Sequence, residues 1–519
     1  MGKILPAIIA LGAFPATAFA QSEDDYFVTT QGLRVRQSDV YEAWFGSDRY
    51  QPNYLRAGVE NGAMLLLELG IYWYEPNTSV VDWQFPNFAA KVTSHNALRF
   101  DDNLLRTNYM LHSTAGGVHY LMTRTNGFGI APSFATAVAS SVLYETVLEW
   151  LEVISINDLI VTPFGGMAAG ETMHLIGDYV NSEQPAVRTE VRGTAGSVTR
   201  DFAGLTLGLP RNVHDEMDTP PSPYAVERDA LGLSTAYAHE FHLRLGQEAL
   251  FDGDRRGEMI VGRGELWIAA MPGFLRPGRF HRWFSNGNFA SVKLRIGGGN
   301  GGEAGDVRFH SHLAGYYAQN IGSGLGTATE VALASGLRYV DRRELDLRQH
   351  YGMVHLPHPV ATLWLRQGGV VAEIGARVSP DFASITSASY QRYAEENGVL
   401  GTRATLKRHG YAHSFGISGE AFASLRFGDV VIGASAEHGR YTTIDHFDRL
   451  QEEIRRPTHG TEAMTELSAR LELEPQGSPV SARFEASELR NDSHLDSHYG
   501  PYQSSTRVRR LSAELGLSF

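Results

Sequence analysis

From about residue 235 to the C-terminus, apolar and polar residues alternate along the chain with a period of two. In residues 288–297 (NFASVKLRIG), Leu294 and Ile296 alternate with Lys293 and Arg295. A period of two predicts β-strands, because successive side chains of a strand point to opposite faces of its sheet. Charged groups on every second residue exclude a closed sandwich core. They suit a barrel whose lumen is wet and whose outer wall meets lipid.

The connections between these strands differ in length in a regular way. Short turns and long polar loops alternate over the last seven predicted strands, which is typical of outer-membrane barrels with tight periplasmic turns and long external loops. We count about twelve strands, although residues 270–287 are longer than the short turn expected there. The short turns lie at residues 367–369, 428–429 and 475–478, and the long loops at approximately 380–410, 441–461 and 490–505.

The final nine residues, LSAELGLSF, also alternate, and they place Leu515, Leu517 and Phe519 on one face. This ending resembles the C-terminal signature of Gram-negative outer-membrane proteins, which the barrel-assembly machinery reads. Such a final strand can close the barrel, since the last strand must pair with the first so that no open edge of the sheet lies in hydrocarbon. The two ends of the sheet are therefore expected to pair.

The strand face that would line the lumen carries charges of both signs. Positive charges outnumber negative ones on this face, although the whole chain has a formal net charge of −13. Such a face indicates an interior that is either wet enough for solutes or plugged by polar contacts. The predicted lumen-facing residues are Glu240, Arg244, Lys293, Arg295, Arg308 and Arg338.

Residues 54–181 show helical signals instead, separated by turn residues. Some fifty residues rich in proline, glycine and charge follow, and they predict a linker or an irregular connection. We therefore expect an α+β chain, in which a small N-terminal helical domain precedes a transmembrane antiparallel β-barrel of about 12 strands. The expected parts are a signal peptide (1–20), a periplasmic helical domain (21–185), a linker (186–233) and the barrel (234–519).

Composition narrows the function further. The first twenty residues combine one lysine, an apolar core and the small-x-small ending Ala18-Phe19-Ala20, which is typical of a secretory signal peptide. The negative net charge argues against nucleic acid as a partner, because neutralising phosphates needs a basic surface. The chain has no cysteine, which excludes disulfides and thiolate metal sites.

The stretch INDLIVTPFGGMAAGE, with DDNLLRTNYMLHSTAGGVHYLMTRTNGFG before it, resembles a family of uncharacterised bacterial envelope proteins. That family is a domain of unknown function often found ahead of a β-barrel. The resemblance covers roughly residues 50–180 and implies a helical domain attached to an outer-membrane protein, with no established activity. The chain departs from the family at His112-Ser113, where His-Pro is common, and at Tyr144-Glu145, where Trp-Glu is favoured.

Several polar residues lie on the apolar predicted helices. His112 and His119 are seven residues apart, and Glu145 and Glu149 are four apart, so each pair should share a helix face. The candidate cluster comprises His112, Arg124, Glu145, Glu149, Asp158 and Glu171.

Three hypotheses remain open for this cluster. It could be a buried hydrogen-bonded network that fixes how the helices pack. It could also serve a hydrolase or transferase, with His112 and one glutamate as an acid–base pair. A di-metal carboxylate site needs two Glu-x-x-His motifs, and the helices offer only Glu171–His174. No metal and no cofactor are therefore predicted.

These features predict a protein of the Gram-negative outer membrane with its N-terminal domain in the periplasm. We expect a channel or an envelope-anchoring, structural role. The alternative is an outer-membrane enzyme that acts on lipid or peptidoglycan through the His/Glu cluster. The expected partners are outer-membrane lipid, the barrel-assembly machinery during biogenesis and a periplasmic protein.

Overall fold

The structure is a computed structural model, and it describes the chain in segments. The predicted signal peptide (1–20) and linker (186–233) lie outside the described residues, so both remain predictions. The described residues are 25–28, 32–36, 52–74, 85–94, 97–100, 103–181, 238–271, 273–285, 287–322, 324–397, 410–444, 459–475, 477–497 and 500–518.

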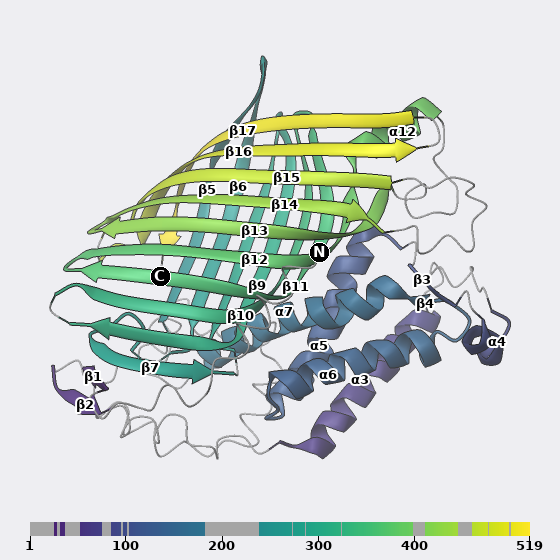
Figure 1. The fold of residues 1–519 in the computed structure, drawn as a ribbon, viewed down its shortest axis with the longest axis horizontal. Coiled ribbons are helices and arrows are strands. Elements are labelled where there is room, and N and C mark those ends of the chain that lie inside the picture. The colour runs from purple at the N-terminus through teal and green to yellow at the C-terminus, as the bar shows by residue number, and fades with distance from the viewer. Residues whose placement is uncertain are drawn as a thin grey trace, which may run out of the picture.

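Twelve antiparallel strands close into a barrel, which confirms the predicted fold of a helical region followed by a barrel (Figure 1). The last strand pairs with the first in a register that places Leu515 opposite Leu245. The twelve strands are β5 (Ala238–Asp252), β6 (Arg255–Ala269), β8 (Phe289–Gly299), β9 (Gly302–Ile321), β10 (Gly326–Glu344), β11 (Leu347–Gln367), β12 (Val370–Thr386), β13 (Tyr411–Phe427), β14 (Val430–Thr443), β15 (His459–Leu473), β16 (Val480–Ser497) and β17 (Gly500–Ser518).

The two ends of the barrel carry different connections. One end, called here the turn end, has the two-residue turns 368–369 and 428–429. Gly428 has a φ of 55°, a left-handed conformation that favours glycine. The opposite end, called here the loop end, carries the connection between β12 and β13, with helix α12 (Ala388–Asn397), and the connection between β14 and β15. Long and short connections therefore lie at opposite ends in this part of the barrel.

The predicted long loop at residues 490–505 is wrong. Strands β16 and β17 continue through it, and Asp496 pairs with Pro501. The stretch is polar for another reason, since Arg490 and Asp492 form an exposed ion pair on strand β16. Polar residues on exposed strand ends resemble a loop in sequence.

The two faces of the barrel wall differ in the way that the alternation predicted. Arg244, Arg295 and Arg338 lie in the lumen, where each contacts carboxylates on other strands of the barrel. Residues of the opposite parity, such as Leu245 and Leu515, are apolar and exposed on the outer wall. The outward apolar residues of the strands are called the apolar belt below.

Residues 270–288, between β6 and β8, are not a simple turn. Strand β7 (Gly278–Phe284) and strand β8 pair with consecutive parts of the same edge of β9. Phe289 of β8 pairs with His312, and Phe284 of β7 pairs with Gly315. Two short strands, β1 (Tyr26–Val28) and β2 (Arg34–Arg36), extend the sheet beyond the outer edge of β7. This arrangement explains why the segment is longer than a turn.

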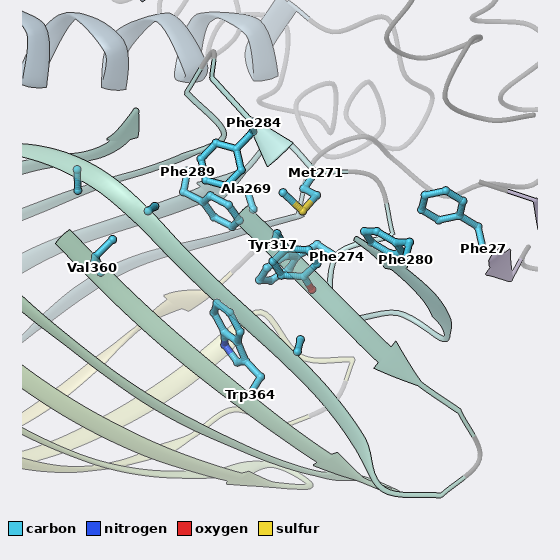
Figure 2. Close-up of a cluster of buried hydrophobic side chains, with 13 residues drawn as sticks. Phe27, Ala269, Met271, Phe274, Phe280, Phe284, Phe289, Tyr317, Val360 and Trp364 are labelled. Atoms are coloured by element: carbon cyan, nitrogen blue, oxygen red, sulfur yellow. The ribbon is translucent and has the colours of Figure 1, made fainter. Parts of the chain in front are cut away.

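The segment before β7 folds back into an aromatic cluster at the turn end (Figure 2). The ring of Phe274 lies 5.3 Å from that of Tyr317 and 5.4 Å from that of Trp364. Arg366 Nη1 donates a hydrogen bond of 2.6 Å to the backbone carbonyl of Leu275, which holds the segment in place. These rings narrow the turn end of the barrel.

The N-terminal residues form helices and two short paired strands. None of the helices in the described ranges is both long and apolar enough to cross a membrane. The elements are α3 (Tyr54–Tyr74), α4 (Phe88–Thr93), β3 (Leu98–Arg99), the π-helical turn η2 (Thr107–Leu111), α5 (His112–Thr125), α6 (Ile130–Leu143), the π-helical turn η3 (Tyr144–Leu148), β4 (Ile154–Ser155) and α7 (Ile156–Asn181). Helices α3, α5, α6 and α7, with η2 and η3, are called the helical bundle below.

The helical bundle lies against the outer wall of the barrel, beside β8–β11, and does not enter the lumen (Figure 1). Thr172 Oγ1 on α7 lies 2.7 Å from Ser311 Oγ on β9. Ser311 belongs to the outward parity of β9, since Arg308, three residues away, bonds across the lumen. Further along the wall, Tyr109 covers Gly352, where an added Cβ would lie 2.0 Å from the Tyr109 ring. The contact therefore uses the face of the sheet opposite to the lumen.

Candidate functional site

Glycines allow α5 and α7 to cross at very short range. An added Cβ on Gly116 would lie 1.9 Å from the carbonyl oxygen of Thr162, and one on Gly166 would lie 2.4 Å from the backbone of Gly116. Small residues at such a crossing let two backbones approach closely. The glycines of the TPFGGMAAGE stretch therefore have a packing role.

The close crossing places an ion pair between the two helices. Arg124, at the end of α5, binds Glu171 of α7 with two hydrogen bonds of 2.9 Å, through Nε and Nη2. Tyr120 donates a third bond of 2.6 Å to Glu171 Oε2. Glu171 is fully buried, so all three bonds to its carboxylate are shielded from solvent.

The barrel completes this buried site from the other side. Gly287 packs directly on Glu171, and a Cβ there would lie 2.0 Å from Oε1. The φ of Gly287 is 63°, so glycine is favoured for its backbone as well. The ion pair of Arg124 and Glu171 is thus enclosed by the bundle and by the segment between β7 and β8.

A second polar group lies at the beginning of α7. His112 Nε2 is 3.6 Å from Asp158 Oδ1, which also accepts a hydrogen bond of 2.8 Å from Asn157 Nδ2. Glu145 Oε2 accepts a bond of 2.9 Å from the backbone N–H of Ser155. His112, Asp158 and Glu145 are therefore linked through the residues that start the helix.

Lys91 of α4 connects Glu149 to this second group. Its ammonium donates to the backbone carbonyl of Glu145 and, at 2.9 Å, to that of Glu149. Lys91 is fully buried, and burial lowers the pKa of its ammonium. The lysine contacts main-chain oxygens here, which stabilises the end of the π-helical turn η3.

The six candidate residues thus fall into two groups. His112, Asp158 and Glu145, with Glu149 nearby, lie at the start of α7, whereas Arg124 and Glu171 lie near its other end. Asp158 and Glu171 are thirteen positions apart, which is about 20 Å along a helix. Among the described residues there is no group of three or more His, Cys, Asp or Glu side chains that could hold a metal ion. A catalytic role for the six residues stays a prediction.

The lumen holds the densest charged site of the described residues, here called the lumen network. Arg338 Nη1 lies 3.0 Å from Glu437, and its Nη2 lies 2.8 Å from Asp306 and 3.1 Å from Glu466. Arg308 contacts the same three carboxylates. These groups come from β9, β10, β14 and β15, so the ion pairs cross the barrel.

The lumen network continues toward β17 through a second set of contacts. Glu344 accepts from Arg295 at 2.9 Å and from Arg510 Nε at 2.8 Å. Arg244 extends the pairing to Glu265 at 2.8 Å and Glu472 at 3.0 Å. The cavity that remains between these side chains has a volume of about 100 Å³. Side chains therefore fill most of the lumen at this level.

The sequence analysis identified part of the lumen network. It placed Arg244, Arg295, Arg308 and Arg338 in the lumen because strand parity defines that face. It did not pair them with carboxylates on distant strands, since parity carries no information about contacts across a barrel. The missed acidic partners include Glu248, Glu265, Asp306, Glu344, Glu437, Glu466 and Glu472.

Histidines missed by the sequence analysis lie in the lumen between the lumen network and the aromatic cluster. His310 Nε2 and His358 Nε2 are 3.2 Å apart. His355 Nδ1 lies 2.7 Å from Asp381, and His312 Nδ1 lies 2.6 Å from Glu330. The only sequence signal was the His-Ser-His alternation at residues 310–312, which places both histidines on one strand face. These side chains add to the filling of the barrel.

The helical region is similar to a known protein family. Residues 97–199 match the profile of a family described as a domain of unknown function, DUF3943. This match agrees with the resemblance seen in the sequence and is centred on α5, α6 and α7. No curated protein matches the chain.

Solved structures with some likeness are outer-membrane barrels. OmpT of Vibrio cholerae is 8% identical, with 55% of this chain and 98% of that chain covered and a TM-score of 0.21. The translocator domain of the autotransporter NalP from Neisseria meningitidis is 13% identical, with 59% and 96% covered and a TM-score of 0.22. The β domain of the Bordetella autotransporter BrkA is 14% identical, with 54% and 100% covered and a TM-score of 0.19. The barrel's own closure and apolar belt, rather than these scores, identify an outer-membrane type of fold.

Proposed function

We propose that this protein has a structural, envelope-anchoring role in the outer membrane, with a barrel that does not conduct solutes. The single observation that carries this proposal is the lumen network, in which Arg338 joins carboxylates from three other strands. A pore needs a continuous water-filled path, and paired side chains occupy that path here. The aromatic cluster around Phe274 narrows the same path at the turn end.

Single-channel recording in planar bilayers tests this proposal. The wild-type protein should show no discrete conductance steps. The variant Arg338→Ser/Glu466→Ser removes one charge of each sign from the lumen and should conduct, because two long side chains and the ion pairs that they make across the lumen are lost. The matched control is Arg507→Ser/Glu488→Ser, which removes an ion pair of the same kind from the outer wall and should stay silent. Steady conductance by the wild-type protein would instead support the channel role.

We infer the orientation of the barrel in the membrane from the lengths of the connections at its two ends. Outer-membrane barrels have short periplasmic turns and longer extracellular loops. This supports a periplasmic turn end and an extracellular loop end. The helical bundle packs along the outer wall, which supports a place beside the barrel for the domain that the sequence predicts to be periplasmic. Partnership with the barrel-assembly machinery and with a periplasmic protein stays a prediction.

The enzymatic alternative receives less support from the geometry. A catalytic group must reach its substrate, yet four of the six candidate residues, Arg124, Glu145, Asp158 and Glu171, are buried. Each of them is also bonded to protein groups, as expected of a network that fixes helix packing. The structural role is therefore the one we put forward.

A further inference from the structure

Helix α3 is turned with its apolar side outward. Its large exposed side chains include Leu55, Leu66, Leu67 and Ile71, with exposed fractions of 79%, 70%, 54% and 56%. The charged residues of α3, Arg56, Glu60 and Glu68, are all at least partly buried. A surface helix of a water-soluble protein has the opposite arrangement, with its apolar stripe toward the core and its charges toward solvent.

The charged residues of α3 lie on the inner side, against α5 and the turn that follows it. Glu68 Oε2 is 3.1 Å from His119 Nε2. Glu60 accepts a hydrogen bond of 2.6 Å from Asn126 Nδ2, and Arg56 donates to the side-chain oxygen of the same asparagine. The polar groups of this helix are therefore satisfied within the bundle.

Helix α6 and the turn η3 repeat this arrangement. Val142, Leu143 and Val147 are exposed, with fractions of 40–43%, while Ser141 and Glu145 are buried on the inner side. The charged residues between positions 130 and 150, Glu145 and Glu149, are both at least partly buried. Two separate parts of the bundle thus present apolar surfaces outward and hold their polar groups inside.

The apolar outer face of the bundle adjoins the apolar belt of the barrel. The bundle covers the wall around Ser311 on β9, and exposed apolar residues border the covered area on both sides, at Leu294 of β8 and Leu333 of β10. Where the bundle covers the apolar belt, the apolar outer face of the bundle becomes the outermost surface of the molecule. The surface that surrounds the molecule therefore remains apolar across the docking site.

We propose that the outer face of the helical bundle contacts the acyl chains of the membrane that surrounds the barrel. Proteins in lipid keep polar groups inside helix bundles and expose apolar side chains, because hydrocarbon offers polar groups no hydrogen-bond partner. Small residues at helix crossings, such as Gly116 and Gly166, belong to the same kind of packing. Bundle and barrel then form one membrane-embedded unit. This inference rests on the proposed membrane location of the barrel.

Spin labels on single cysteines test the inference, and the absence of native cysteines makes each label unique. Leu67→Cys on α3 and Val147→Cys on η3 report on the bundle. Ile374→Cys in the apolar belt and Arg507→Cys on the polar outer wall serve as references. In reconstituted bilayers, the collision rates of each label with oxygen and with a water-soluble nickel chelate are measured. At both bundle positions, the ratio of oxygen to nickel collisions should match Ile374 and exceed Arg507 several-fold.

Three results would overturn the inference. If Leu67→Cys and Val147→Cys resemble Arg507→Cys while Ile374→Cys favours oxygen, the bundle lies in water although the barrel lies in lipid. If both bundle labels collide rarely with either reagent, a protein partner or a second copy of the chain covers the face. If Ile374→Cys also favours the nickel chelate, the membrane location of the barrel fails first, and the inference fails with it.

Discussion

Replacing Arg124 with methionine should destabilise the helical bundle by about 3–5 kcal/mol, because it leaves the carboxylate of Glu171 buried without its charged partner. Glu171 is fully buried and accepts two bonds from this arginine. Gly287 packs against its far side, so water has no room to replace the guanidinium. Methionine keeps much of the volume of the arginine side chain, so the loss comes mainly from the charge.

Urea-dependent proteolysis of the detergent-solubilised protein measures this loss as a lower midpoint for cleavage in the bundle. Arg255→Met is the matched control, since its ion pair with Asp346 is exposed and should contribute at most about 1 kcal/mol. The double variant Arg124→Met/Glu171→Leu should recover much of the stability, because it leaves no unpaired buried charge. Equal midpoints for Arg124→Met and Arg255→Met would show that the buried ion pair does not hold the bundle together.

Gly166→Ala should separate α5 from α7 and destabilise their contact by about 1–3 kcal/mol, as overpacking of a tight interface does. The added methyl would lie 2.4 Å from the backbone of Gly116, and neither backbone can move without disturbing its helix. Because α7 also packs on the barrel, the change should loosen the bundle from the wall. The same proteolysis measurement reports it as earlier cleavage within α5 and α6.

The matched control for Gly166→Ala is Gly62→Ala on α3. Nothing lies within 4 Å of a Cβ at that position, so the change should stabilise the helix by roughly 0.5–1 kcal/mol through its propensity alone. If Gly166→Ala is as stable as the wild-type protein, then the α5–α7 crossing is wider than the structure shows.

The barrel could be predicted from sequence because its signals are local. Alternation along a strand defines two faces, and the apolar C-terminal strand indicated the closure that pairs Leu515 with Leu245. The β16–β17 hairpin was mistaken for a loop because polar residues on an exposed strand end leave no apolar alternation. Residues 270–288 could not be predicted, since the position of β7 depends on a partner segment of β9 far along the chain.

The candidate site was less predictable, for physical reasons that concern the helices. Glu145 and Glu149 were expected on one helix face, but the π-helical turn η3 begins at Tyr144 and changes the angular spacing of the residues that follow. His112 and His119 were also expected to share a face. His119 bonds to α3, whereas His112 approaches Asp158 on α7. Spacing on one helix does not determine which neighbour each side chain meets.

The side of the wall on which the bundle docks could not be inferred from helical periodicity either. A period near 3.6 shows that a helix has two faces, but it does not show whether the apolar face meets protein or lipid. The exposed Leu66 and Leu67 on α3 and the inward Glu68 are what distinguish the two cases, and only the structure places them.

Disulfide cross-linking in isolated membranes tests most directly the central claim that the bundle docks on the outer wall of a closed barrel. Thr172 Oγ1 and Ser311 Oγ are 2.7 Å apart, so the variant Thr172→Cys/Ser311→Cys should form a disulfide under mild oxidation. The control Thr172→Cys/His310→Cys moves the second cysteine by one residue to the lumen face and should remain reduced. Cross-linking of the control pair without the Ser311 pair would place α7 inside the barrel and contradict the account.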